Sequence, residues 1–254
     1  MKIIAIAVNT FREAVRDKIL YSLLFFALVM MGLSVILGNL TIGEQIKIIE
    51  DFGLGTISLF GVLIAIFVGV GLVYKEIERR TIYTILSKPI PRWIFLLGKY
   101  GGLLLTLFVE VFVMVVFFSL LVFFYGVGFD FALLKAIGLI YLELALITAV
   151  ALFFSAFTTP TLSGFFTLGI FAIGHLSTDL KVFGEGTKDP FLSGLTSFLY
   201  YLLPNLENFN IKGQVVHQIP VSWEFIGWST LYGLLYIAGT LLLTVLIFQK
   251  RDFR

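Results

Sequence analysis

The sequence predicts an all-helical membrane protein that crosses the bilayer six times as a single transmembrane domain, residues 1–254. Hydrophobic residues make up 59% of the chain and charged residues only 13%, which is too apolar for a water-soluble domain. The apolar residues form continuous runs of about 20 residues or more, the length that a membrane-crossing helix needs. The strict alternation of a membrane barrel is absent from these runs. The fold class is therefore all-α and polytopic.

An N-terminal amphipathic helix is predicted over residues 1–18, lying along the inner membrane surface. Ile4, Val8 and Phe11 recur at helical spacing on one face, while Arg12 and Arg16 lie on the other. No small-residue cleavage site follows a compact apolar core, so this segment does not have the order of a signal peptide. A plain cytoplasmic extension of the first span is the alternative interpretation.

Six apolar runs define the spans, at about 19–38, 56–73, 94–125, 134–157, 161–177 and 225–248. The third run is longer than a span requires, because about 32 helical residues reach roughly 48 Å against a core of about 30 Å. Its first turns therefore lie in the interface, or the helix is tilted. Glycines in the second and fifth spans allow another helix to approach closely. We expect these two spans to join two copies of the chain, although packing within one bundle explains the same glycines, which are Gly61, Gly69, Gly71, Gly164, Gly169 and Gly174.

Two outer segments separate the spans. Residues 41–55 are predicted to be a short polar loop, because they contain Glu44, Lys47, Glu50 and Asp51. Residues 179–223 form the longest polar segment. Within it, 190–204 is too short to cross a bilayer and too apolar to lie free in water. We expect a re-entrant or interfacial outer helix there.

The placement of Lys and Arg predicts the orientation. Six spans with both termini in the cytoplasm leave only five of the 18 basic residues outside, namely Lys47, Lys135, Lys181, Lys188 and Lys212. Cytoplasmic loops carry an excess of Lys and Arg, so this orientation satisfies the positive-inside rule. The sequence thus predicts a multi-pass protein of the cytoplasmic (inner) membrane.

The connection 74–99, between the second and third spans, is the most highly charged stretch of the chain. Ile77, Ile82 and Ile85 recur at roughly helical spacing, and Pro89 and Pro91 then end the pattern. These features predict a short helix lying flat against the membrane, with its charged face toward the cytoplasm.

This loop resembles the first cytoplasmic loop of type-2 ABC transporter permeases, which are mostly exporters. The residues that carry the resemblance are Glu76, Glu78, Thr81, Ile82, Leu86, Ser87, Lys88, Pro89, Arg92, Gly98 and Lys99. Span number, amphipathic start and long penultimate outer loop also agree, so the resemblance covers most of the chain. One departure is Arg80, which stands where the family usually has a glycine, and it puts the local bend of the loop in doubt.

The resemblance implies a permease subunit that is not itself an enzyme. In that family the loop carries a coupling helix that docks on a separate ATPase subunit, so ATP and Mg are expected on that partner and no cofactor on this chain. A second permease copy or a paralogue is also expected, and no nucleic acid. The implied ATPase-coupling residues are Glu76, Glu78, Arg79, Arg80, Thr81, Ile82, Leu86, Lys88, Pro89 and Arg92.

The sequence holds no arranged catalytic set. It has no Walker phosphate loop, no HExxH motif, no nucleophile elbow and no cysteine. A membrane-embedded enzyme or assembly factor that acts on lipid or membrane protein without an ATPase is the alternative function. The Phe- and Leu-rich spans suit either a lipid-facing surface or a path for an apolar substrate, so composition does not identify the cargo.

Two carboxylates fall within spans, Glu110 and Glu143, where a charge is costly and usually retained for a reason. Counted along ideal helices from the turn near Asp130, they differ in depth by about 10 Å, which argues against a shared-proton pair. Each is expected either to form a structural hydrogen bond or to line a polar path. His175 and Asp179 could share a helix face, but two side chains do not make a metal site.

Overall fold

The computed structural model describes residues 2–41, 43–78, 91–125, 130–187 and 189–250. Its regular structure over these residues is helical throughout, which confirms the predicted fold class. The elements are α1 (Lys2–Ala14), α2 (Lys18–Asn39), α3 (Gln45–Glu78), α5 (Arg92–Phe124), α6 (Phe131–Ser155), α7 (Pro160–His175), α8 (Ser177–Gly186), α9 (Pro190–Leu202), the 3-10 turn η1 (Leu206–Phe209), α10 (Lys212–Val216) and α11 (Trp223–Lys250).

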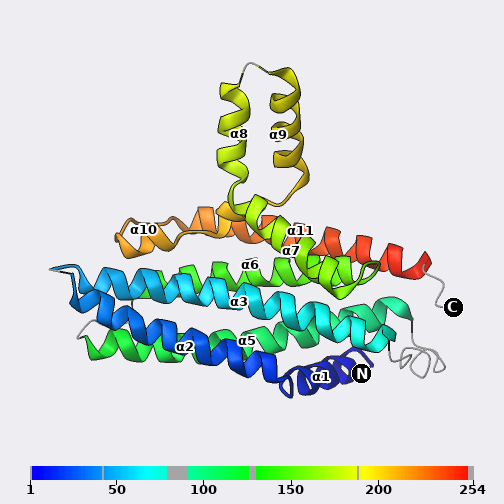
Figure 1. Ribbon diagram of the computed structural model, residues 1–254, viewed down its shortest axis with the longest axis horizontal. Coiled ribbons are helices and arrows are strands. Elements are labelled where there is room, and N and C mark those ends of the chain that lie inside the picture. Colours follow the sequence, from blue (N-terminus) through cyan, green and yellow to red (C-terminus); the bar gives the residue numbers. More distant parts are fainter. Residues whose placement is uncertain (1, 42, 79–90, 126–129, 188, 251–254) are drawn as a thin grey trace.

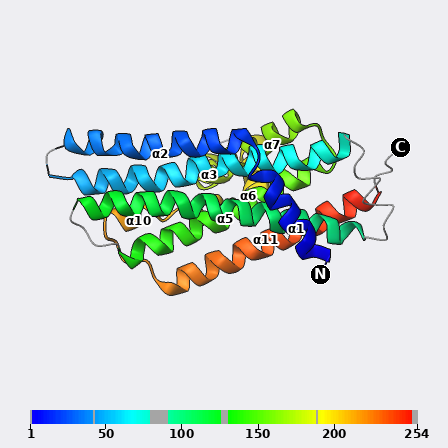
Figure 2. The same ribbon diagram turned by 90° about the horizontal axis from the view of Figure 1, so that it is seen from below.

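Among the described residues, five helices are long and apolar enough to cross a membrane: α2, α3, α5, α6 and α11. A sixth span is present if the bent pair of α7 and α8 is counted as one. The long helices lie side by side along the longest axis of the molecule, and both ends of the chain lie at the same end of the bundle (Figures 1 and 2). Most of α3 and α6 is buried within the chain, whereas α2 and α11 are largely exposed. The core of the bundle is therefore built around α3 and α6.

The second membrane helix begins earlier than predicted. Residues 41–55 were expected to form a polar loop, but α3 is helical from Gln45 onward. The expectation was wrong because polar side chains do not interrupt a helix that extends beyond the hydrocarbon; Glu50 and Asp51 lie within it. At the start of α3, Lys47 Nζ donates a hydrogen bond of 2.7 Å to Oε1 of Glu44, the residue before the helix. This hydrogen bond lowers the pKa of Glu44.

Glycines of the second and fifth spans pack within the chain. A Cβ atom at Gly61 would lie 2.5 Å from Leu144 of α6, and one at Gly174 would lie 2.6 Å from Leu206. Gly69 likewise faces Ala151 across the α3–α6 contact. Gly71 and Gly169, in contrast, meet nothing within 4 Å. Packing within the chain thus accounts for some of these glycines, and the contact of the second and fifth spans between two copies of the chain stays a prediction.

The long polar segment begins with a sharp change of direction. α7 and α8 meet at a bend of 62°. α8 and α9 then form a hairpin that projects sideways from the bundle (Figure 1). The hairpin closes where Gly184 leaves room for Thr196, and it carries exposed Phe183 and Phe191. α9 occupies the run 190–204 for which an outer helix was predicted; its re-entrant or interfacial position stays a prediction.

Candidate functional site

The predicted coupling loop is described only at its two flanks. α3 ends at Glu78 and α5 begins at Arg92. Glu76 and Glu78 fall in the last turn of α3, so the backbone of both is helical. The other predicted coupling residues lie outside the described residues, namely Arg79, Arg80, Thr81, Ile82, Leu86, Lys88 and Pro89. The site is therefore described from α3 and α5, which flank these residues, and from the helices packed against α5.

Arg92 fastens the start of α5 to the end of α11. Its Nη1 donates hydrogen bonds to the carbonyl oxygens of Phe248, at 2.7 Å, and Gln249, at 2.9 Å. The last carbonyls of a helix lack partners within it, and a cation is favourable at that negative end of the helix dipole. The Phe95 ring also stacks on Phe248, with ring centroids 6.1 Å apart. The exit of the loop and the C-terminal helix thus form one unit.

The N-terminal helix α1 packs against the next turns of α5 through glycines. A Cβ atom at Gly102 would lie 2.5 Å from the carbonyl oxygen of Ala7 and 2.5 Å from Thr10 Cβ. One turn earlier, a Cβ atom at Gly98 would lie 2.7 Å from Ile6. Glycine at these positions is what lets the two helix backbones come this close.

The face of α1 that packs on α5 is not the large apolar face found in the sequence. Thr10 and Ala14 are fully buried, whereas Ile4 and Val8 are exposed. Thr10 and Ala14 therefore pack toward α5 together with Ile6, whereas Ile4 and Val8 are left exposed, as expected for an interfacial helix.

Lys99 adds an electrostatic contact between the same two helices. It is 1% exposed, and its Nζ lies 3.6 Å from Glu13 Oε2 of α1. A buried charge is tolerated when it is paired, and loss of the partner leaves that charge uncompensated. Sequence reasoning placed Lys99 in the loop motif but missed Glu13, because nothing in the sequence says which helix covers the start of α5.

The same stretch of α5 reaches the centre of the bundle. The Tyr100 hydroxyl donates a hydrogen bond of 3.1 Å to the carbonyl oxygen of Ala145 in α6. Within three turns, α5 therefore contacts α11, α1 and α6. We call this stretch, from Arg92 to Gly102, the α5 joint.

Glu143 is part of a second polar cluster, deep in the bundle. It is 1% exposed, and its Oε1 is hydrogen-bonded to His175 Nε2 at 2.8 Å. His175 Nδ1 lies 3.6 Å from Glu207 Oε2, which is partly exposed. Asn210 Nδ2 donates a hydrogen bond of 3.0 Å to the other oxygen of Glu207. The imidazole thus bridges a buried carboxylate of α6 and a surface carboxylate of η1.

Glu110 lies apart from this cluster. It is 5% exposed on α5, and its Oε2 accepts no hydrogen bond from the described residues. The two span carboxylates therefore have different surroundings, in agreement with the expectation that they do not share a proton. The sequence suggested that His175 and Asp179 could share a helix face. In the structure His175 ends α7 and Asp179 lies in α8 beyond the bend, and the partner of His175 is Glu143. No group of three or more His, Asp or Glu among the described residues could hold a metal ion.

Replacing His175 by Leu is expected to destabilise the protein strongly. The change leaves the Glu143 carboxylate buried without its partner, which typically costs about 3–5 kcal/mol. Removing both charges in a Glu143→Leu, His175→Leu double variant should be less damaging than the single His175→Leu change, because no buried charge remains. Thermal unfolding in detergent measures both. A double variant that is less stable than either single variant would contradict this account.

Comparison with known proteins adds one finding. A family model described as ABC-2 family transporter protein matches residues 4–253, nearly the whole chain. The comparison with curated proteins finds no match.

Proposed function

Because the chain belongs to the ABC-2 family of transporter proteins, we propose that it is the membrane permease subunit of an ATP-driven exporter. ATP and Mg bind to a separate ATPase subunit in this proposal, and the present chain carries the path through the membrane. A second copy or a paralogue completes that path, since one bundle with α3 and α6 packed at its centre leaves little room for an enclosed one.

The observation that carries the proposal is the α5 joint. The loop 74–99, whose last part is the start of this joint, is the part of the chain that resembles a docking element for an ATPase. When the ATPase moves this loop, the motion reaches α11 through Arg92, α1 through Lys99 and α6 through Tyr100. A contact of this kind converts nucleotide binding outside the membrane into a rearrangement of the spans.

Co-purification tests the proposal. Extraction in mild detergent of the chain expressed with its native partners should bring down an ATPase of the size of a nucleotide-binding domain in stoichiometric amount. The same preparation should hydrolyse ATP, although this chain has no Walker phosphate loop. A chain that purifies without any ATPase would favour the alternative of an enzyme or assembly factor.

The proposed orientation places both termini in the cytoplasm and α10 outside. The chain has no native cysteine, so single cysteines report on one site at a time. Gln214→Cys, in α10, should react with an impermeant thiol reagent in intact cells, whereas Arg12→Cys, in α1, should be protected; both positions are exposed on the protein. Labelling of Arg12→Cys with protection of Gln214→Cys would reverse the topology.

A further inference from the structure

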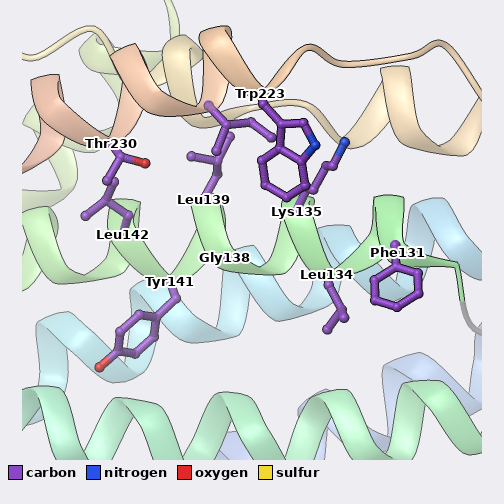
Figure 3. Close-up of a pocket in the computed structure, with 10 residues that line it drawn as sticks. Phe131, Leu134, Lys135, Gly138, Leu139, Tyr141, Leu142, Trp223 and Thr230 are labelled. Carbon is purple, nitrogen blue, oxygen red and sulfur yellow. The ribbon is translucent and has the colours of Figure 1, made fainter.

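A groove of about 670 Å³ runs along the surface of α6 beside α11, at the end of the bundle opposite the two termini. Its walls are apolar, with Leu134 and Leu139 from α6 and Ile226 from α11. Gly138 forms the floor, and a Cβ atom there would meet nothing within 4 Å. Figure 3 shows the bare backbone of Gly138 between these side chains. The size is that of a site for a small organic ligand.

The groove lies near the starts of two helices that are long and apolar enough to span a membrane. α6 begins at Phe131 and α11 begins at Trp223, and both aromatic side chains are more than 70% exposed. Exposed aromatic residues at the starts of spanning helices are typical of the boundary between headgroups and hydrocarbon. Gly138 and Leu134 are exposed as well, so the groove is open toward the lipid.

One cationic side chain, that of Lys135, lies at the opening of the groove. Lys135 Nζ lies 4.4 Å from the centre of the Trp223 ring and donates a hydrogen bond of 3.3 Å to the carbonyl oxygen of Val221. Figure 3 shows the Lys135 and Trp223 side chains next to each other. No carboxylate of the described residues forms an ion pair with it. An ammonium group has three donors, so two remain for a ligand. A half-buried Lys in a spanning helix is expected to have an anionic partner.

Lys135 also lines a second, more polar hollow of about 370 Å³ on its other side. Asp130, Gln218 and the backbone around Pro220 line this hollow. The Asp130 carboxylate accepts a hydrogen bond from the Ala132 amide and so caps α6. An apolar groove and a polar hollow thus meet at a single ammonium group, and this shape matches an amphiphile with an apolar chain, an anionic centre and a polar head.

We propose that this site binds a phospholipid, with an acyl chain lying along Gly138, the phosphate bound by Lys135 and the remainder of the head in the polar hollow. The charge favours a phosphate, and the opening toward the bilayer favours a ligand that arrives from the membrane. The bound lipid then joins α6 to α11. This lipid site is independent of the ATPase.

Native mass spectrometry of the full chain in detergent tests the site, with phosphatidylglycerol and phosphatidylethanolamine as ligands. One lipid of either kind should bind per chain, and Lys135→Gln should weaken binding at least about tenfold, the usual effect of losing a charged hydrogen bond. Lys135→Arg should retain binding. Gly138→Leu should abolish it by filling the groove, and the helix should tolerate the change because a Cβ atom there meets nothing within 4 Å.

Two controls distinguish binding at this site from non-specific attraction of lipids to the protein. Lys181→Gln removes another cation that lies over an aromatic ring, 4.7 Å from Tyr200, on the α8–α9 hairpin, and should leave binding unchanged. Diacylglycerol, which has the chains without the phosphate, should bind the native chain no better than it binds Lys135→Gln. Equal binding of diacylglycerol and phospholipid, or native affinity in both Lys135→Gln and Gly138→Leu, overturns the proposal.

Discussion

Replacing Gly102 by Ala should release α1 from α5 and so uncouple ATP hydrolysis from transport. The new Cβ atom would lie 2.5 Å from the backbone oxygen of Ala7. A backbone atom cannot relieve this clash by a change of rotamer, as the end of a side chain could. Overpacking of this kind costs about 1–3 kcal/mol. Because α5 is the main packing partner of α1, the helix should separate from the joint rather than distort the bundle. A cysteine at Ala14, which is fully buried, should then react with a thiol reagent about tenfold faster or more.

Gly101→Ala is the matched control. It is the adjacent residue of the same helix and makes the same change in helix propensity, but its Cβ atom would lie 3.8 Å from Ala7 Cβ, an ordinary contact. The cysteine at Ala14 should stay protected, and ATP hydrolysis by the purified complex should match that of the native protein. If Gly101→Ala and Gly102→Ala behave alike, close approach of α1 is not what holds the joint.

Replacing Arg79 and Arg80 together by Glu should abolish association with the ATPase. At a docked interface, reversal of charge sets like charges against each other and can cost several kcal/mol, whereas reversal of a solvated charge usually changes stability by less than about 0.5 kcal/mol. The chain should still insert, because the change leaves the apolar spans unaltered. Co-purification and ATP hydrolysis measure the loss.

Lys181→Glu with Lys188→Glu is the corresponding control, with the same change of charge in a segment predicted to lie on the other side of the membrane. It should leave the ATPase bound. If the Arg79→Glu, Arg80→Glu double variant inserts normally and still binds an active ATPase, this loop is not the coupling element.

The spans could be predicted from sequence because the bilayer imposes a length and an apolar character on each of them. α2, α5 and α11 begin and end within a few residues of the predicted bounds. The start of α3 could not be predicted in this way, since its first turns, with Glu50 and Asp51, extend beyond the hydrocarbon and carry no hydropathy signal.

The contacts of the site depended on tertiary information that a single sequence lacks. Glu143 and His175 were each noticed, but the pairing of residues 32 positions apart follows from how α6 and α7 pack. The hydrogen bond from Arg92 to the carbonyl oxygen of Phe248 in α11 likewise joins residues 156 positions apart. Lys135 was counted only as a topology signal, and neither hydropathy nor spacing indicates the groove that it borders.

The packing of α1 on α5 also sets an order for biogenesis. Thr10 of α1 is synthesised well before Gly98 and Gly102 of α5, which follow it in the chain only after α2 and α3. At a synthesis rate of about 5–20 residues per second, α1 waits roughly 5 to 20 s for its partner. During that interval the Ile4 and Val8 face can hold it on the membrane surface. The two faces of α1 thus act in succession, the large apolar face while the chain is being made and the small-residue face once α5 is in place.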